Sequence, residues 1–243
     1  MSTHTVKAYE EELTRLHNTI VQMGGLAETQ LDLAIKAIIR RDPNLAASII
    51  KEDEKVDRLD HEVDAMTTKL LALRQPMAAD LRSIIGAIKI SVDLERIADY
   101  AANIARRAIT LTQSSPVKPV YAIPRMARLV QNMIKDVLDA FIARDLEKAM
   151  TVWNADEEVD EMYTSLFREL LTYMIEDPRS ITACTHLLFV AKNIERIGDH
   201  TTNIAETLYF MVSGKRLLAA RPRGQAREEY DMAAILDQTT GKT

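Results

Sequence analysis

The sequence predicts an all-α protein that is a tandem duplication of an antiparallel three-helix bundle, with six long helices. The run Glu-Arg-Ile-Ala-Asp at Glu95 returns at Glu195 as Glu-Arg-Ile-Gly-Asp, and seven of twelve positions are identical from Leu94 and Ile194. Hydrophobic residues make up 47% of the 243 residues but aromatic ones only 5%. The core must therefore be aliphatic, as is typical of helix bundles.

The duplication extends toward the N-terminus. Nine of twenty-one positions are identical between residues 37–57 and 140–160, at an offset of 103 residues. We therefore predict four parts: a first three-helix repeat over 1–113, a linker over 114–119, a second repeat over 120–213 and a mobile C-terminal tail over 214–243.

Periodicity and helix breakers place three helices in the first half. The first is expected from about Val6 to Arg40, where Gly24-Gly25 allows a bend. Asp42-Pro43 is an N-cap followed by proline at the first helical position, so the second helix begins there. It should extend to about Arg74, before Gln75-Pro76. The third is expected from near Pro76 to about Thr112, with an apolar stripe at Ile90, Leu94, Ile97, Ala101, Ile104 and Ala108.

The second half repeats this plan after the linker 114–119, in which Pro116 and Pro119 cannot continue a helix. Its helices are predicted at about 123–144, 145–176 and 179–213, with Asp177-Pro178 as the break and Gly214 as the stop. No stretch alternates with the period of a strand, so a β-sheet is not expected. Short connections make consecutive helices antiparallel neighbours.

Charge and hydropathy exclude several classes of protein. The net charge is −5 with both signs interspersed, which argues against a nucleic-acid surface. No apolar run is long enough to span a bilayer and the N-terminus lacks a signal peptide, so we expect a cytoplasmic protein with no direct membrane insertion. The single cysteine, Cys184, lies in an apolar context that indicates a buried thiol. The basic tail, residues 214–243, is interpreted either as a solvated extension or as a docking arm for an acidic partner.

Both halves carry paired carboxylates four residues apart, a spacing that places them on one helix face. Antiparallel second and third helices would bring two pairs together in each half. The eight residues are Asp53, Asp57, Glu95, Asp99, Asp156, Asp160, Glu195 and Asp199. Oxygen ligands suit hard cations, so the pattern predicts a divalent or multinuclear metal such as Mg, Mn or Fe. Asn103 and Asn203 extend each acidic line by one turn and are candidates to support the site.

Other interpretations of these pairs remain open. The carboxylates could form a solvated helix face, or Arg58, Arg96 and Arg196 could neutralise them as ion pairs. The copies also diverge, because Asp60 and Asp64 continue the acidic line in the first half where Tyr163 and Phe167 stand in the second. The two sites therefore need not hold the same number of ions.

No catalytic constellation stands out. The chain has neither a Gly-rich phosphate loop nor the Glu-x-x-His pair that builds di-iron carboxylate enzymes in bundles. His200 is interpreted as a surface or packing residue. We therefore expect a non-enzyme. A carboxylate-bridged metal-dependent enzyme and a metal-free helical adaptor are the alternatives.

The acidic motifs resemble those of the PhoU family of bacterial phosphate-signalling proteins. The resemblance covers about residues 5 to 213 and is carried by Asp53-Glu54-Lys55-Val56-Asp57, Asp156-Glu157-Glu158-Val159-Asp160 and, most specifically, the Glu-Arg-Ile-Gly-Asp-His run at Glu195. It implies tandem three-helix bundles and a metal-binding, non-enzymatic negative regulator of the phosphate-starvation regulon and of phosphate uptake. The implied partners are the ATPase subunit of a phosphate ABC transporter and a phosphate-sensing histidine kinase. We also expect a homodimer.

Overall fold

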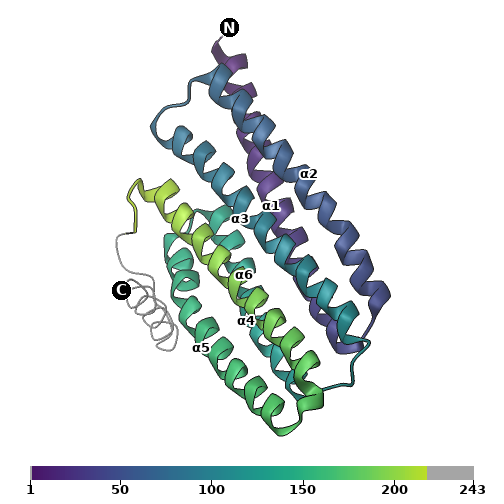
Figure 1. Ribbon diagram of the computed structural model, residues 1–243. Helices are drawn as coiled ribbons and strands as arrows, with labels where there is room; N and C mark the ends of the chain where they lie inside the picture. Colours follow the sequence, from purple (N-terminus) through teal and green to yellow (C-terminus); the bar gives the residue numbers. More distant parts are fainter. Residues whose placement is uncertain (1, 218–243) are drawn as a thin grey trace, which may run out of the picture.

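The computed structural model describes residues 2–217, which form six long α-helices and two short 3-10 helices (Figure 1). The helices are α1 (Ser2–Arg40), α2 (Pro43–Arg74), α3 (Ala78–Leu111), η1 (Lys118–Ala122), α4 (Ile123–Ala143), α5 (Leu146–Glu176), η2 (Pro178–Ser180) and α6 (Ile181–Ser213). No strand occurs among these described residues. The predicted all-α fold of six long helices is confirmed.

Matching caps begin the second helix of each half. The Asp42 carboxylate accepts hydrogen bonds from the backbone N–H groups of Asn44 and Leu45, both at 3.0 Å. Asp145 accepts two bonds of the same length from the second and third residues after it. The residue before each aspartate, Arg41 or Arg144, has a φ of +53°, which turns the chain from one helix into the next. The predicted Asp caps are confirmed in both halves.

The later connections differ between the halves. After α2 the chain passes through Gln75-Pro76-Met77 and starts α3 at Ala78 with no side-chain cap. After α5, Asp177 accepts a 3.1 Å hydrogen bond from the backbone N–H of Arg179, and the turn η2 precedes α6. The connections therefore differ in length as well as in backbone, with three residues between α2 and α3 and four between α5 and α6.

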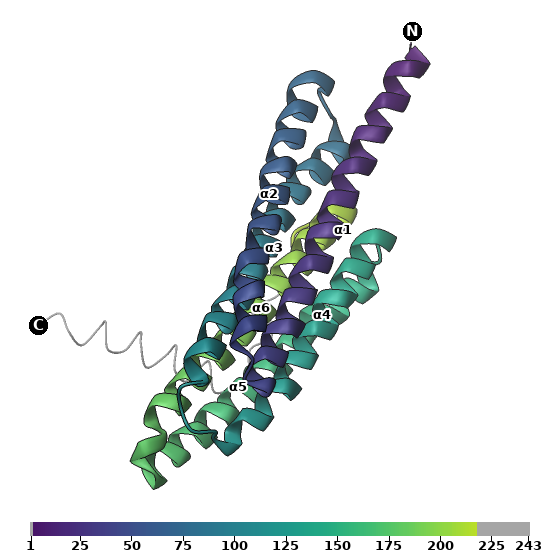
Figure 2. The same cartoon turned by 90° about the vertical axis from the view of Figure 1, so that its right-hand side faces the viewer.

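The two three-helix bundles, α1–α3 and α4–α6, pack against each other through α3 and α6, which lie side by side (Figure 1). Helix α1 of the first bundle also contacts α4 of the second (Figure 2). The pairing of α3 with α6 is antiparallel, because Arg82, early in α3, bonds to the carbonyl of Met211 near the end of α6. Later in α3, Arg107 contacts His186 near the start of α6. The two bundles are therefore packed through equivalent helices with opposite directions.

The core is aliphatic along its whole length. The apolar stripe predicted for α3 is buried at every position. The only tryptophan, Trp153, lies at the edge of the core and donates a 2.9 Å hydrogen bond to Glu206. Cys184 is fully buried, as predicted. Within the described chain, none of the helices combines the length and the apolar character needed to cross a bilayer.

The predicted domain boundaries remain a prediction, and most of the predicted tail, residues 218–243, lies outside the described residues. The linker region is described. Between the end of α3 and the start of η1, residues 112–117 form a turn and an extended stretch.

Gly24 and Gly25 have different surroundings, although α1 continues through both. A Cβ at Gly24 would lie 2.4 Å from Cδ2 of Leu138 on α4, whereas a Cβ at Gly25 would meet nothing within 4 Å. Gly24 therefore allows the close approach of α1 and α4, a role that the sequence did not reveal.

We expect Gly25→Ala to stabilise the protein by up to about 1 kcal/mol, because alanine favours the helix. Gly24→Ala gains the same helix propensity but must displace Leu138, at a cost of about 1–3 kcal/mol. Denaturant unfolding of the two variants measures the difference. Equal stabilisation by both would show that α1 and α4 are not in close contact at Gly24.

Candidate functional site

The carboxylates of the first half gather between α2 and α3. Asp53 on α2 is buried, with 9% of its surface exposed. Burial raises the pKa of Asp53 to about 6, and the negative charges of Asp99 on α3 and of Asp57 add to the shift. Arg106 opposes it. The two helices therefore bring the predicted pairs within electrostatic reach of each other.

Glu95 belongs to the same group. Burial raises its pKa, and the charges of Asp99, Asp60 and Asp57 raise it further. Asp60 is thus a fifth member that the sequence showed only as a continuation of the acidic line. Its Oδ1 is buried and makes no hydrogen bond. A buried carboxylate oxygen with no donor is a position where a cation would be favourable.

Arginine neutralises this cluster only in part. The guanidinium of Arg96 lies 3.5 Å from Glu95 and 3.7 Å from Asp99, and 54% of its side chain is exposed. Exposed pairs of this kind contribute little, typically less than about 1 kcal/mol. Arg58 pairs instead with Glu54, and Arg196 lies over the ring of Tyr100. Arg96 therefore contacts two of the predicted ligands of the first half.

The carboxylates of the second half are more deeply buried. Asp156 and Asp160 on α5 and Glu195 on α6 have 1–2% of their surface exposed. Gly198 of α6 faces this group, because a Cβ there would lie 3.7 Å from Oδ1 of Asp156. Thr202 donates a 3.4 Å hydrogen bond to the same oxygen. Side chains of α5 thus approach the α6 backbone closely at Gly198.

A lysine contacts the glutamate of this second cluster. Lys192 Nζ lies 2.7 Å from Oε2 of Glu195, whose side chain is 2% exposed. The same ammonium group lies 5.0 Å from the centroid of the Tyr163 ring. Tyr163 stands where the first half has Asp60, so an aromatic ring replaces one carboxylate. The fourth predicted ligand, Asp199, is half-buried on α6. The two clusters therefore differ in charge as well as in burial.

The donor set of the clusters fits a hard cation, because the predicted ligands are all carboxylates. Residues 2–217 nevertheless contain no group of three or more His, Cys, Asp or Glu side chains arranged to hold a metal ion as they stand. The metal assignment remains a prediction that is supported by charge, burial and donor chemistry.

The two asparagines make different contacts. Asn203 donates a 3.4 Å hydrogen bond to Asp93 of α3, and His200 Nδ1 lies 2.8 Å from the same oxygen. The ring centroids of His200 and Tyr100 are 5.6 Å apart. Asn103 accepts a 2.7 Å hydrogen bond from Arg106. His200 is therefore a packing residue between α3 and α6, as predicted, and Asn203 joins it there.

The raised pKa of Asp53 has a consequence for stability. Its value of about 6 lies above the usual 3.8, so the ionised form destabilises the folded state. The loss of folding free energy from ionised Asp53 is absent below about pH 4 and reaches its full size above about pH 6. In metal-free protein, Asp53→Asn should therefore raise the free energy of unfolding at pH 7.5 and lose this advantage near pH 4. Denaturant unfolding across that range measures it.

Glu54→Gln is the matched control, because Glu54 is 73% exposed and pairs only with Arg58 at 3.9 Å. Its effect should be small at every pH. A pH-independent effect of Asp53→Asn would contradict the assignment of a strained carboxylate at this position.

The sequence and the fold are similar to those of known proteins. The model of the PhoU domain matches residues 20–108 and 123–208, two stretches that begin 103 residues apart and end 100 apart, as the internal repeat does. The chain is 53% identical over 224 residues to a phosphate-specific transport system accessory protein PhoU homolog of Caulobacter vibrioides, covering 92% of this chain and 97% of the relative. It is 46% identical to the Rhizobium meliloti homolog, with 98% of both chains covered.

Two solved structures are similar as well. The crystal structure of PhoU from Pseudomonas aeruginosa matches with a TM-score of 0.82 and 38% identity, covering 85% of this chain and all of that one. The phosphate transport system regulatory protein PhoU from Streptococcus pneumoniae matches with a TM-score of 0.81 and 27% identity, covering 87% of this chain and all of that one. Family model, relatives and structures agree, and the chain belongs to the PhoU domain family.

Proposed function

We propose that this chain is a cytoplasmic accessory protein of phosphate transport that acts as a negative regulator of the phosphate-starvation genes and of phosphate uptake. The observation that carries the proposal is the PhoU match in both halves, together with relatives named for the phosphate-specific transport system over nearly their whole length. The proposed partners are the ATPase subunit of the transporter and a phosphate-sensing histidine kinase. The proposed working form is a homodimer.

Exposed apolar side chains support a role in protein binding. Leu73 and Met77, at the α2–α3 connection, are 66% and 80% exposed. Ile175, at the α5–α6 connection, is 81% exposed. Apolar side chains at corresponding turns of two repeats offer contacts for partner proteins. A regulator of this kind acts through unequal affinity for the states of its partners.

Binding without catalysis fits the contacts of the reactive side chains. The pair formed by His200 and Asp93 is occupied with packing α6 on α3. Cys184 is buried and contacts the hydroxyl of Ser180. Neither arrangement presents an activated nucleophile to solvent. We therefore propose a non-enzymatic adaptor.

We further propose that each carboxylate cluster binds a divalent or multinuclear metal, with Mg, Mn and Fe as candidates. In the first half, the buried Asp53 and the unbonded Oδ1 of Asp60 support a cation there. Bound metal would offset the repulsion between carboxylates and tie the second helix of each half to the third. A metal-free adaptor is the second candidate, favoured by the pairing of Lys192 with Glu195.

Deletion of the gene tests the regulatory proposal. Phosphate-starvation genes should be expressed in phosphate-rich medium in the deletion strain, and the unaltered chain should restore repression. The double variant Met77→Glu with Ile175→Glu should restore it poorly, because charge at the exposed turns weakens partner contacts while leaving the core unchanged.

Ile39→Glu is the control, since Ile39 is 49% exposed on α1, away from these two connections. It should complement normally. Normal repression in the deletion strain would refute the proposal. Full activity of the double variant would refute only the assignment of the binding surface.

A further inference from the structure

A groove lies between α1, α4 and the last turns of α6, and holds about 210 Å³. Its walls are apolar at Phe141 and Met211 and polar at Thr14, His17 and Asn18. Arg144 stands at its rim, at the end of α4. His17 and Arg144 line the same groove, and burial and the charge of Arg144 lower the pKa of His17. The groove therefore combines apolar surface with a fixed positive charge.

The internal repeat gives a direct comparison for Arg144. Arg41 is its counterpart, with the same φ of +53° and the same following aspartate cap. Arg41 donates hydrogen bonds to the carbonyls of Thr112 and Ser114, at 2.9 and 2.5 Å. These carbonyls belong to the segment that follows α3. Arg144 makes no hydrogen bond or ion pair within the described chain.

In the first half, the chain that leaves the third helix thus returns over the end of the first helix and is held by arginine. Further along the same connection, Val117 and Val120 pack against the core. In the second half, the chain that leaves α6 continues into residues 218–243, which lie outside the described residues. By its position in the repeat, the segment that follows α6 is therefore the counterpart of the segment that follows α3 and is held by Arg41.

We propose that residues 218–243 dock in this groove and that Arg144 is their anchor. The last turns of α6 form one wall of the groove, so the segment begins beside its binding site. Ten residues lie between Leu217 and Glu228, and the eleven steps along the chain can span up to about 36 Å. Glu228, Glu229 and Asp231 match the positive charge of Arg144, and Met232, Ile235 and Leu236 follow them as apolar side chains for the apolar wall.

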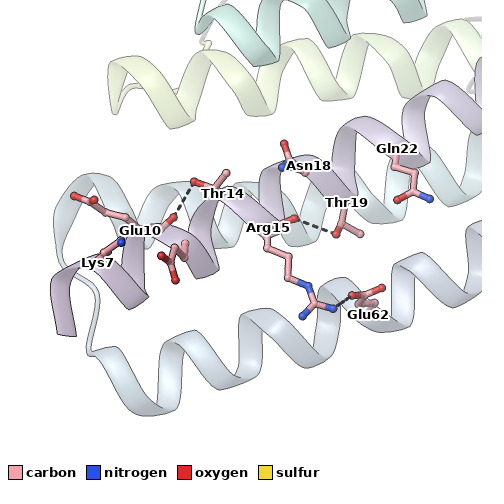
Figure 3. Close-up of a pocket in the computed structure, with 9 residues that line it drawn as sticks. Lys7, Glu10, Thr14, Arg15, Asn18, Thr19, Gln22 and Glu62 are labelled. Carbon is pink, nitrogen blue, oxygen red and sulfur yellow. Dashed lines mark hydrogen bonds and ion pairs between the residues drawn. The ribbon is translucent and has the colours of Figure 1, made fainter. Parts of the chain in front are cut away.

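The neighbouring surface makes a poorer site for this segment. The hollow on the outer face of α1 shares Thr14 and Asn18 with the groove but is lined by Glu10, Glu11 and the ion pair of Arg15 with Glu62 (Figure 3). Acidic side chains outnumber basic ones there. The carboxylates at 228, 229 and 231 are repelled by that hollow and attracted to Arg144, whereas the arginines of the segment, at 221, 223 and 227, precede this acidic stretch.

Hydrogen exchange of the full chain tests the proposal. Residues 14–21 and 138–145 should exchange more slowly in the full chain than in a chain that ends at Leu217. Arg144→Glu should speed exchange within residues 226–237 by about tenfold, because it removes one charge-assisted contact. Arg125→Glu, an exposed arginine near the other end of α4, should leave this exchange unchanged.

A charge swap provides the second arm. Combining Arg144→Glu with Glu228→Arg and Glu229→Arg should restore the slow exchange that Arg144→Glu alone loses. Equal exchange of the groove in the full and shortened chains would overturn the proposal. Protection that depends on protein concentration and persists in the shortened chain would also overturn it, since a second copy would then occupy the groove. If the charge swap does not restore slow exchange, Arg144 is not the residue that anchors the segment.

Discussion

The antiparallel packing of α3 on α6 is the interaction on which the rest of this molecule depends. These two helices each bury fifteen residues and are equivalent members of the two repeats. Gly86 of α3 makes the close approach possible, because a Cβ there would lie 2.2 Å from the sulfur of Met211. Between the helices, the bond of His200 with Asp93 adds a polar contact to the apolar seam. This packing holds the two carboxylate clusters in fixed positions on one rigid scaffold.

The clusters themselves carry an electrostatic cost that packing must offset. In the first half, the cost appears as the raised pKa values of Asp53 and Glu95, with an exposed Arg96 giving partial relief. In the second half, burial is deeper and Lys192 contacts Glu195 directly. Duplicated sites with different compensation are expected to differ in cation affinity, because the number and charge of the ligands set affinity.

Much of the fold could be predicted from the sequence, because its signals are local. The caps at Asp42 and Asp145 are encoded by residues within one turn of the helix end, and the apolar stripe of α3 by its own period. The carboxylate pairs were found in the same way, since four-residue spacing defines a helix face. Contacts between residues on different helices could not be predicted from such local signals. The role of Gly24 depends on Leu138 of α4, and the partner of Asn203 is on α3.

The differences in contacts between the two repeats could not be predicted from the sequence either. Asp60 joins the first cluster because α2 and α3 present it toward Glu95, and the sequence does not specify that rotation. Arg41 and Arg144 share a following aspartate and a φ of +53°, yet among residues 2–217 only Arg41 is bound by the chain after its third helix. Identical local signals thus lead to different contacts where distant segments differ.

Metal content is the most direct test of the central claim that each half binds a cation through its carboxylates. The purified chain is equilibrated with Mn²⁺, freed of unbound metal and measured by elemental analysis. Glu95→Gln with Asp99→Asn, and Glu195→Gln with Asp199→Asn, should each remove the metal bound by their own half and leave that of the other half. Asp136→Asn with Asp139→Asn is the matched control, because these α4 carboxylates pair with Lys148 outside both clusters. The control should keep all of its metal, and unchanged metal content in both cluster variants would contradict the account.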